Sequence, residues 1–248
     1  MKLNPHCSAR LGFGPVFCLL LMASGAVQSG RPLSSDDAGS ADPGSCALEG
    51  WGEKTGSERA LVLAPACGIA EGWEIGFDYS HPQPRDEIRG EAGMSIKWVP
   101  KSWGLLTAAG QINFGLKVGV GFERPTQSGW RRHGQGLLGL ATLVVNEDFA
   151  VHANLGPQQD RASGQTATAL NLAAVWVPSP LGLMYAELQT NDRRSLMGNT
   201  VRTLGALWWL TPDKLGLSMT ASQEAGSGQT LWSLGFGWYG LNAWTTGP

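Results

Sequence analysis

The residue types most often used in catalysis are thinly spread through this sequence. Its four histidines stand far apart, at positions 6, 81, 133 and 152. No CxxC, HExxH, Gly-x-Ser-x-Gly or phosphate-binding glycine loop is present, so the spacings that metal, nucleophile or nucleotide chemistry requires are missing. We therefore predict no catalytic residue, no metal site and no cofactor, and we expect that the chain is not an enzyme. A lone His152 is more often structural than catalytic.

The polar residues that could act together occupy alternate positions of short segments. If one face of each segment lines an interior, these side chains point into it. They are Glu74, Asp78, Arg89, Glu91, Lys97, Asn113, Lys117, Glu123, His152 and Asn154. Buried charges must be paired or hydrated, and we expect Asp78 opposite Arg89 and Glu91 opposite Lys117. Two interpretations stay open: the pairs fill a narrow interior, or they line a small aqueous passage and bias its selectivity.

The segments that carry these residues repeat every second position. From Gln111 to Glu123 the even positions are apolar and the odd positions are polar or glycine. Such a run cannot be a helix, whose apolar positions recur every three to four residues. At about 3.3 Å per residue and a tilt of about 40°, a strand of this length crosses a bilayer core. The clear and weaker segments of this kind are 46–53, 59–67, 73–80, 87–98, 111–123, 135–145, 151–156, 165–177, 181–189, 200–210, 214–222 and 232–239.

The composition agrees with strands that meet lipid on one side only. Charged residues make up 15% of the chain, the formal net charge is -2 and the mean hydropathy is -0.09. A nucleic-acid-binding protein would carry a basic stripe, and a helical membrane protein would be more apolar. We predict an all-β fold, an antiparallel up-and-down transmembrane β-barrel of about 12 strands with about ten as the alternative, since bacterial barrels favour even numbers. We expect no nucleic-acid partner.

The chain divides into four predicted parts. Residues 1–28 form a cleaved signal peptide, because basic residues precede an apolar run that ends before small residues at 23–26. This run is too short for a helical membrane anchor, and no Gly or Ala precedes Cys18 as in a lipoprotein. Residues 29–45 are a flexible polar arm, residues 46–241 the barrel and residues 242–248 a C-terminal tail. Export and spanning strands together predict the bacterial cell outer membrane.

The connections between the segments fall into two classes. At one end they are mostly short; at the other, over 54–58, 81–86, 124–134, 157–164, 190–199 and 223–228, they are polar and mostly longer. Outer-membrane barrels have short periplasmic turns and longer outer loops. The cations of the outer loops are Arg131, Arg132, His133, Arg161, Arg193 and Arg194. They either bind the phosphates of a surface glycolipid, since guanidinium binds phosphate bidentately, or are ordinary solvated charges.

Tryptophan is unusually frequent, with 11 residues against 3 tyrosines. Five lie near the periplasmic ends of predicted strands: Trp73, Trp98, Trp176, Trp208 and Trp238. Indole prefers the membrane–water interface because its ring is apolar and its N–H is polar. We predict an aromatic girdle on that side; the alternative is a soluble core with tryptophan at its strand ends.

Two cysteines, Cys46 and Cys67, remain after the signal peptide. If 46–53 and 59–67 form a hairpin centred near 56–57, these residues face each other at a separation that a disulfide can bridge. An exported chain favours the oxidised pair. Two free thiols are the alternative.

The N-terminal part of the mature sequence resembles a known family. The residues that carry the likeness are Arg31-Pro32-Leu33, Asp36-Asp37-Ala38-Gly39, the run from Asp42 to Glu49, Trp51, Pro65-Ala66-Cys67-Gly68 and Trp73-Glu74-Ile75-Gly76. They resemble outer-membrane β-barrel proteins grouped with the putative phenol-degradation meta-pathway transporters. The resemblance covers residues ~31–80 and implies an envelope barrel for uptake of small, often apolar compounds. Many such barrels end on an aromatic residue, whereas this chain runs on to Pro248.

Two functions of different kinds follow from these patterns. The first is a monomeric passive pore or transporter for an unknown small molecule, apolar or aromatic ones included, with outer-membrane lipid and surface glycolipid as its surroundings. The second is a filled-lumen barrel that serves structure or surface interaction without channel activity. A third, an outer-membrane hydrolase, would need a Ser, His and acid cluster in the outer loops, which the sequence does not provide.

Overall fold

The computed structural model describes residues 33, 35–84, 87–161, 163–193 and 200–243. The predicted signal peptide and nearly all of the predicted C-terminal tail lie outside these residues. Among the described residues, no helix has the length and apolar character needed to cross a bilayer.

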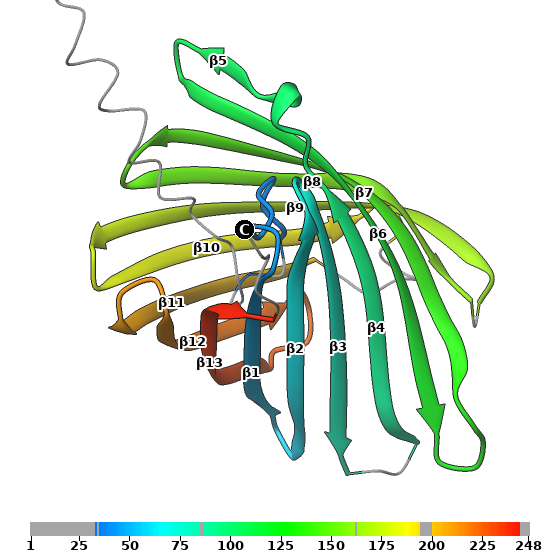
Figure 1. The fold of residues 1–248 in the computed structure, drawn as a ribbon. Coiled ribbons are helices and arrows are strands. Elements are labelled where there is room, and N and C mark those ends of the chain that lie inside the picture. The colour runs from blue at the N-terminus through cyan, green and yellow to red at the C-terminus, as the bar shows by residue number, and fades with distance from the viewer. Residues whose placement is uncertain (1–32, 34, 85–86, 162, 194–199, 244–248) are drawn as a thin grey trace, which may run out of the picture.

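Twelve long antiparallel strands form a closed barrel (Figure 1). The strands are β1 (Ser45–Thr55), β2 (Glu58–Ala70), β3 (Trp73–Gln83), β4 (Ile88–Trp98), β6 (Gly110–Pro125), β7 (Arg131–Asn146), β8 (Phe149–Asp160), β9 (Gln165–Ser179), β10 (Gly182–Asn191), β11 (Val201–Thr211), β12 (Leu215–Glu224) and β13 (Thr230–Asn242). Each pairs with the next along the chain, and β1 pairs with β13 to close the ring. The short β5 (Leu105–Thr107) pairs antiparallel with the start of β6, and the 3-10 helix η2 (Lys101–Trp103) precedes β5. The predicted fold is confirmed.

The strands connect at two ends, as the sequence predicts. The termini end, where β1 begins and β13 finishes, has the connections 71–72, 99–109, 147–148, 180–181 and 212–214. The loop end has 56–57, 84–87, 126–130, 161–164, 192–200 and 225–229. Several strands continue beyond their predicted bounds: β2 runs on to Ala70, and Arg131, Arg132 and His133 begin β7 instead of lying in a loop. Arg131 and Arg132 pair with Glu123 and Phe122 on β6, and His133 lies at a register shift of this ladder.

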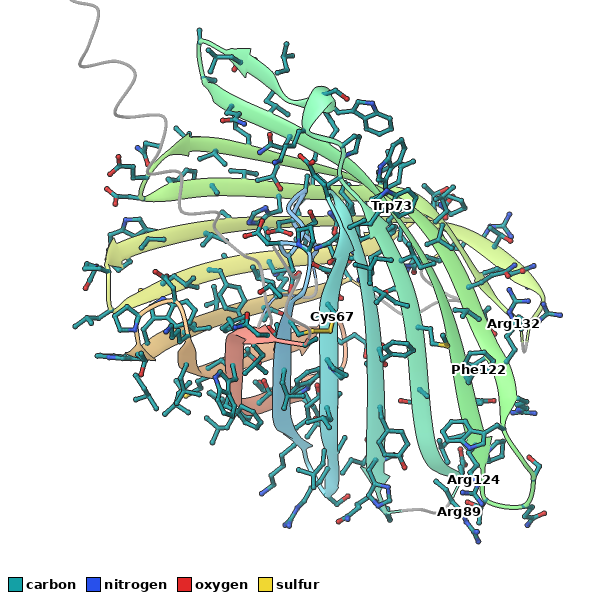
Figure 2. All side chains as sticks on the ribbon, in the orientation of Figure 1. Cys67, Trp73, Arg89, Phe122, Arg124 and Arg132 are labelled. Atoms are coloured by element: carbon teal, nitrogen blue, oxygen red, sulfur yellow. A yellow bond between two sulfur atoms is a disulfide. The ribbon has the colours of Figure 1, made fainter. Side chains whose placement is uncertain are left out.

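The two faces of each strand have opposite polarity. Along β8, the inward Asn154 is 1% exposed while the next residue, Leu155, is 57% exposed. Inward positions carry His152, Thr142, Thr203 and other polar groups, and outward positions carry Leu, Met, Phe and Trp (Figure 2). A soluble protein would bury the second set. The arrangement fits a barrel whose outer surface meets lipid and whose lumen is polar.

The five predicted girdle residues share the outward face near the termini end. Their indole rings are exposed in part, and Trp73 stacks on Trp98 with ring centroids 5.6 Å apart. Trp103 of η2 packs edge-on against Trp98 at 4.9 Å. This places three indoles in one cluster beside β3 and β4. Their role at the membrane interface stays a prediction, which this placement suits.

Cys46 and Cys67 form the predicted disulfide between β1 and β2. The hairpin turns at Gly56, whose φ of 56° is left-handed and suits glycine. Thr55 pairs with Glu58 across this turn, and the register carries through to Cys46 opposite Cys67. The bond therefore ties the barrel's first hairpin at the termini end, where the chain enters β1.

Candidate functional site in the barrel lumen

The N-terminal arm lies inside the barrel. Leu33 and residues 35–44 run along the lumen wall, and Figure 1 shows this blue segment enclosed by the ring of strands. Ser35 is 2% exposed and Asp37 is 4% exposed. The expectation of a flexible arm is therefore wrong for the described part of it. Its polar composition, which suggests disorder in isolation, matches a polar lumen instead.

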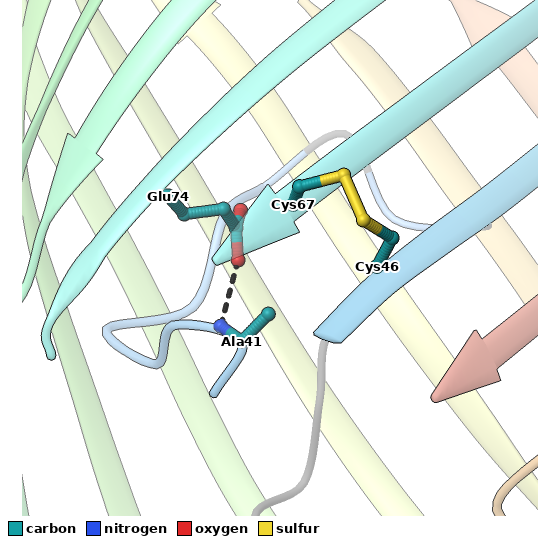
Figure 3. The surroundings of a disulfide bond; sticks show 4 residues. All are labelled: Ala41, Cys46, Cys67 and Glu74. Carbon is teal, nitrogen blue, oxygen red and sulfur yellow. Dashed lines mark hydrogen bonds between the residues drawn. A yellow bond between two sulfur atoms is a disulfide. The ribbon is translucent and has the colours of Figure 1, made fainter. Parts of the chain in front are cut away.

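Backbone amides of the arm donate hydrogen bonds to side chains of the wall. The pairs are Ser35 to Glu187, Asp36 to Asn154 at 2.8 Å, Ala38 to Thr142 at 2.7 Å and Ala41 to Glu74 at 2.9 Å. The Asn154 amide also donates back to the Asp36 carbonyl at 2.8 Å. Figure 3 shows the bond from Ala41 to Glu74 next to the disulfide. The wall thus binds the arm as an extended peptide and satisfies backbone groups that would otherwise be buried unpaired.

The arm is anchored where it leaves the lumen. Gly44 donates to the carbonyl of Gly68 at 2.8 Å, and Pro43 forms a parallel bridge with the same residue. A Cβ at position 68 would lie 2.3 Å from backbone oxygens of the arm, so only glycine allows this approach. Cys67, which forms the disulfide with Cys46, directly precedes Gly68 on β2. The root of the arm is therefore fixed to a covalently closed hairpin.

Two lysines stand directly opposite each other in the wall. Lys97 on β4 pairs in register with Lys117 on β6 and, on its other side, with Glu74 on β3. Like charges directly opposite on neighbouring strands destabilise a sheet. Lys97 is 5% exposed, so little solvent screens the pair. Additional negative charge at this point would offset the repulsion between Lys97 and Lys117.

The arm supplies that charge. The Lys117 Nζ lies 2.6 Å from a carboxylate oxygen of Asp36, whose other oxygen is 3.8 Å from the Lys97 Nζ. Lys97 also contacts Asp37 at 3.3 Å and Glu74 at 3.1 Å. Asp36 therefore bridges the two lysines. We call Asp36, Asp37, Glu74, Lys97 and Lys117 the lysine cluster.

Apolar contacts complete the seat of the arm. Leu33 packs against Ala173, Val175 and Tyr185 on β9 and β10. Ala38 packs against Val99, which follows β4, and against Leu140 on β7. The arm consequently contacts the lumen wall at both of these places.

The predicted charge pairs do not form. Asp78 lies opposite Gly93, and Glu91 lies opposite Ser80 and Glu123. The reason is the register of the two ladders: Trp73 pairs with Trp98 between β3 and β4, and Lys97 pairs with Lys117 between β4 and β6, so each acid lies several residues from its expected partner. Arg89 lies at a register shift between β4 and β6, and it is exposed near Arg124 (Figure 2).

The other predicted lumen residues separate into groups along the barrel. His152 is fully buried, and its Nδ1 lies 2.9 Å from the Thr142 hydroxyl that accepts the Ala38 amide. Glu123 sits at the loop end, where Arg131 contacts it at 2.6 Å and His133 at 3.1 Å. Asn113 lies near the termini end and accepts a hydrogen bond from Gln111. Only Glu74, Lys97, Lys117, His152 and Asn154 gather around the arm.

Two open cavities remain beside the arm, and acidic residues dominate their walls. One of about 450 Å³ lies against β1–β4, and one of about 680 Å³ lies against β4–β9. Asp36, Asp78, Glu91, Ser95 and Lys117 line both, so the two spaces meet around the arm. The acids of the two linings together are Asp36, Asp37, Glu49, Glu53, Glu74, Asp78, Glu91 and Asp160, and the bases are Lys97, Lys117 and His133.

Sequence reasoning missed several residues of this site. No role is predicted for Asp36 and Asp37 from the sequence. Glu49 and Glu187 lie in segments with weak alternation and are not among the predicted lumen residues. Period two places both glutamates on the inward face, so this signal was present in the sequence. Glu49 accepts a hydrogen bond from the Tyr239 hydroxyl at 2.8 Å. Contact between the arm and a wall more than a hundred residues away in sequence leaves no local pattern.

A family model described as "Uncharacterised conserved protein UCP029691" matches residues 17–201, more than half of the chain. The chain belongs to this family. No curated protein matches it by sequence. The grouping with phenol-degradation transporters is not confirmed by these comparisons.

Solved porins share the barrel of this UCP029691 member. The KdgM porin is 12% identical with a TM-score of 0.57, over 77% of this chain and 98% of that one. The NanC porin is 10% identical with a TM-score of 0.58, over 78% and 98%. KdgM has also been solved in complex with disordered oligogalacturonate. At such low identity these likenesses show the fold alone.

Proposed function

We propose that this protein is a non-enzymatic, porin-like pore of the bacterial outer membrane that passes small polar molecules. Its own N-terminal arm, which is bound to the lumen wall, restricts this passage. The observation that carries the proposal is the wall at the lysine cluster. There, polar side chains of the barrel form their ion pairs and hydrogen bonds with the N-terminal arm instead of with one another. A barrel built only for structure would fill this space with side chains of its own strands.

The charges of the lumen favour cations and neutral polar solutes. Acids outnumber bases in the walls of both cavities, and a low-dielectric wall focuses their field on the passage. Such a lining gives little attraction to the apolar or aromatic solutes that the family resemblance implied. It also opposes a polyanion such as the oligogalacturonate bound by the KdgM porin.

The charge preference is testable by reversal potential. In a chain that lacks residues 33–41, a planar bilayer with a KCl gradient is expected to show a cation-selective potential. Asp78→Asn combined with Glu91→Gln should lower this selectivity, because both carboxylates line the open cavities. Glu147→Gln is the matched control, since this acid is exposed in the turn between β7 and β8. Anion selectivity of the parent chain would contradict the proposal.

A filled barrel without channel activity is the second candidate, and the buried arm favours it. In that case the arm never leaves the lumen. Both the full chain and the chain that lacks residues 33–41 then serve only structure or surface interaction. In both readings we propose a monomer surrounded by outer-membrane lipid, with the loop end at the cell surface. The conductance of the full chain and of the chain that lacks residues 33–41 separates the two candidates.

A further inference from the structure

Two grooves indent the membrane-facing surface of the barrel. The first, about 540 Å³, runs over β3–β9 between apolar side chains that include Ile96, Val118 and Leu137. The second, about 840 Å³, runs over β8–β13 between Leu172, Leu204 and Trp232. Both are mostly apolar and lie on the face that lipid covers. Their width comes from small or short outward residues, such as Ala174, Ala186 and Ala221 in the second.

Each groove ends at an arginine near the loop end. Arg132 is the second residue of β7 and lines the first groove; Arg202 is the second residue of β11 and lines the second. Both side chains are exposed, and neither makes an ion pair within the part of the chain that the structure describes. A glutamine accompanies each arginine, Gln135 in the first groove and Gln223 in the second.

The position of these arginines limits what can meet them. An arginine on the lipid-facing side costs about 2–4 kcal/mol at the bilayer midplane and about 0–1 kcal/mol near the interface. At the second position of their strands, both guanidinium groups reach the level of the lipid headgroups. A guanidinium there has a bidentate partner in a headgroup phosphate, and the apolar groove below it accepts an acyl chain.

The residue next to Arg132 shows that the arrangement is specific. Arg131 faces the lumen and binds Glu123 at 2.6 Å. Arg132 pairs in register with the outward Phe122, and Figure 2 shows the two side chains on neighbouring strands. Adjacent arginines therefore have different surroundings: Arg131 forms an ion pair with Glu123 at the loop end of the barrel, and Arg132 faces the membrane.

We propose that the Arg132 and Arg202 grooves are two binding sites for a phosphorylated glycolipid of the outer leaflet. The acyl chains of the lipid fill the grooves, and its phosphates bind the two guanidinium groups. This inference rests on the membrane location in the proposed function but not on the pore, so it stands or fails separately from conductance.

Native mass spectrometry of the detergent-purified protein tests the sites. The probes are a bisphosphorylated glycolipid and the same glycolipid after enzymatic removal of its phosphates. The unaltered protein is expected to retain the phosphorylated form preferentially. Arg132→Gln and Arg202→Gln should each weaken its retention about tenfold, the effect of losing one charge-assisted hydrogen-bonded contact, and the double variant should lose the preference.

Two further variants separate the parts of the site. Arg131→Gln is the matched control and should leave lipid retention unchanged, because this residue faces Glu123. Ala186→Phe narrows the second groove and should weaken retention of both glycolipids without changing the preference for phosphate. Equal retention of the two glycolipids by the unaltered protein, or an equal loss in Arg131→Gln, would overturn the proposal.

Discussion

A chain that lacks residues 33–41 is expected to conduct ions several-fold better in a planar bilayer than the full chain. In the described conformation, Leu33 and residues 35–41 lie in the lumen, where ion pairs of the lysine cluster and backbone amide hydrogen bonds to the wall hold them. Removing them joins the two cavities into one passage. The disulfide and β1 stay intact because the deletion ends before Cys46. Single-channel recordings of both chains at the same salt concentration give the comparison.

A synthetic peptide with the sequence of residues 33–42 is the matched test of reversibility. Added to the shortened barrel, it should restore block, whereas a peptide of the same composition in scrambled order should not. If neither the full nor the shortened chain conducts ions, the result would favour the filled-barrel function. Equal, open conductance from both would show that the arm does not close the pore.

The second large effect is expected from Lys97→Met, which should release the arm. This substitution leaves three carboxylates, those of Asp36, Asp37 and Glu74, around an apolar side chain. Breaking a buried ion pair by removing one partner costs about 3–5 kcal/mol. The arm can avoid this cost by leaving the lumen, whereas the barrel wall cannot. Hydrogen–deuterium exchange of residues 35–41 should therefore become fast while exchange in β6–β13 stays slow.

Lys101→Met is the matched control for this experiment. Lys101 also binds a carboxylate, that of Glu71 at 2.7 Å, but both side chains are exposed at the termini end. Its hydrogen bond lowers the pKa of the Glu71 carboxyl, yet such surface pairs contribute little to stability. The arm should stay protected in this variant. Persistent protection in Lys97→Met as well would mean that the charge cluster does not hold the arm.

The barrel could be predicted because alternation is a property of each strand alone. Gln111–Glu123 shows period two without reference to any neighbour, and β6 extends from Gly110 to Pro125. The disulfide followed from one hairpin whose turn needs glycine at position 56. Local turn chemistry fixes the register of a hairpin over its whole length. These features require only short-range information.

The charge pairs could not be predicted because they depend on register between strands. In the observed register Lys117 lies opposite Lys97 instead of Glu91, and Asp78 lies opposite Gly93 instead of Arg89. The two lysine charges in register are unfavourable without the arm, whose Asp36 carboxylate contacts both of them. The arm itself shows only polar composition, and the wall that binds it is formed by residues far along the chain, such as Asn154 and Glu187.

The outward arginines show a similar limit. Arg132 is predicted as a loop residue and instead belongs to β7, while Arg202, the third residue of the weak predicted segment 200–210, has no predicted role. Their importance depends on the grooves beside them, which form only when four or more strands lie together. No sequence pattern shows the surface around either arginine.

Cross-linking from position 40 in intact membranes tests the central claim most directly. A photoreactive residue in place of Ser40, which lies outside the lysine cluster, is irradiated, and the adducts are mapped by mass spectrometry. An arm inside the lumen predicts adducts on β1–β4, whose inward residues line the same cavity as Ser40. Adducts to lipid or to other proteins, with none on the inward face of these strands, would show that the arm lies outside the barrel.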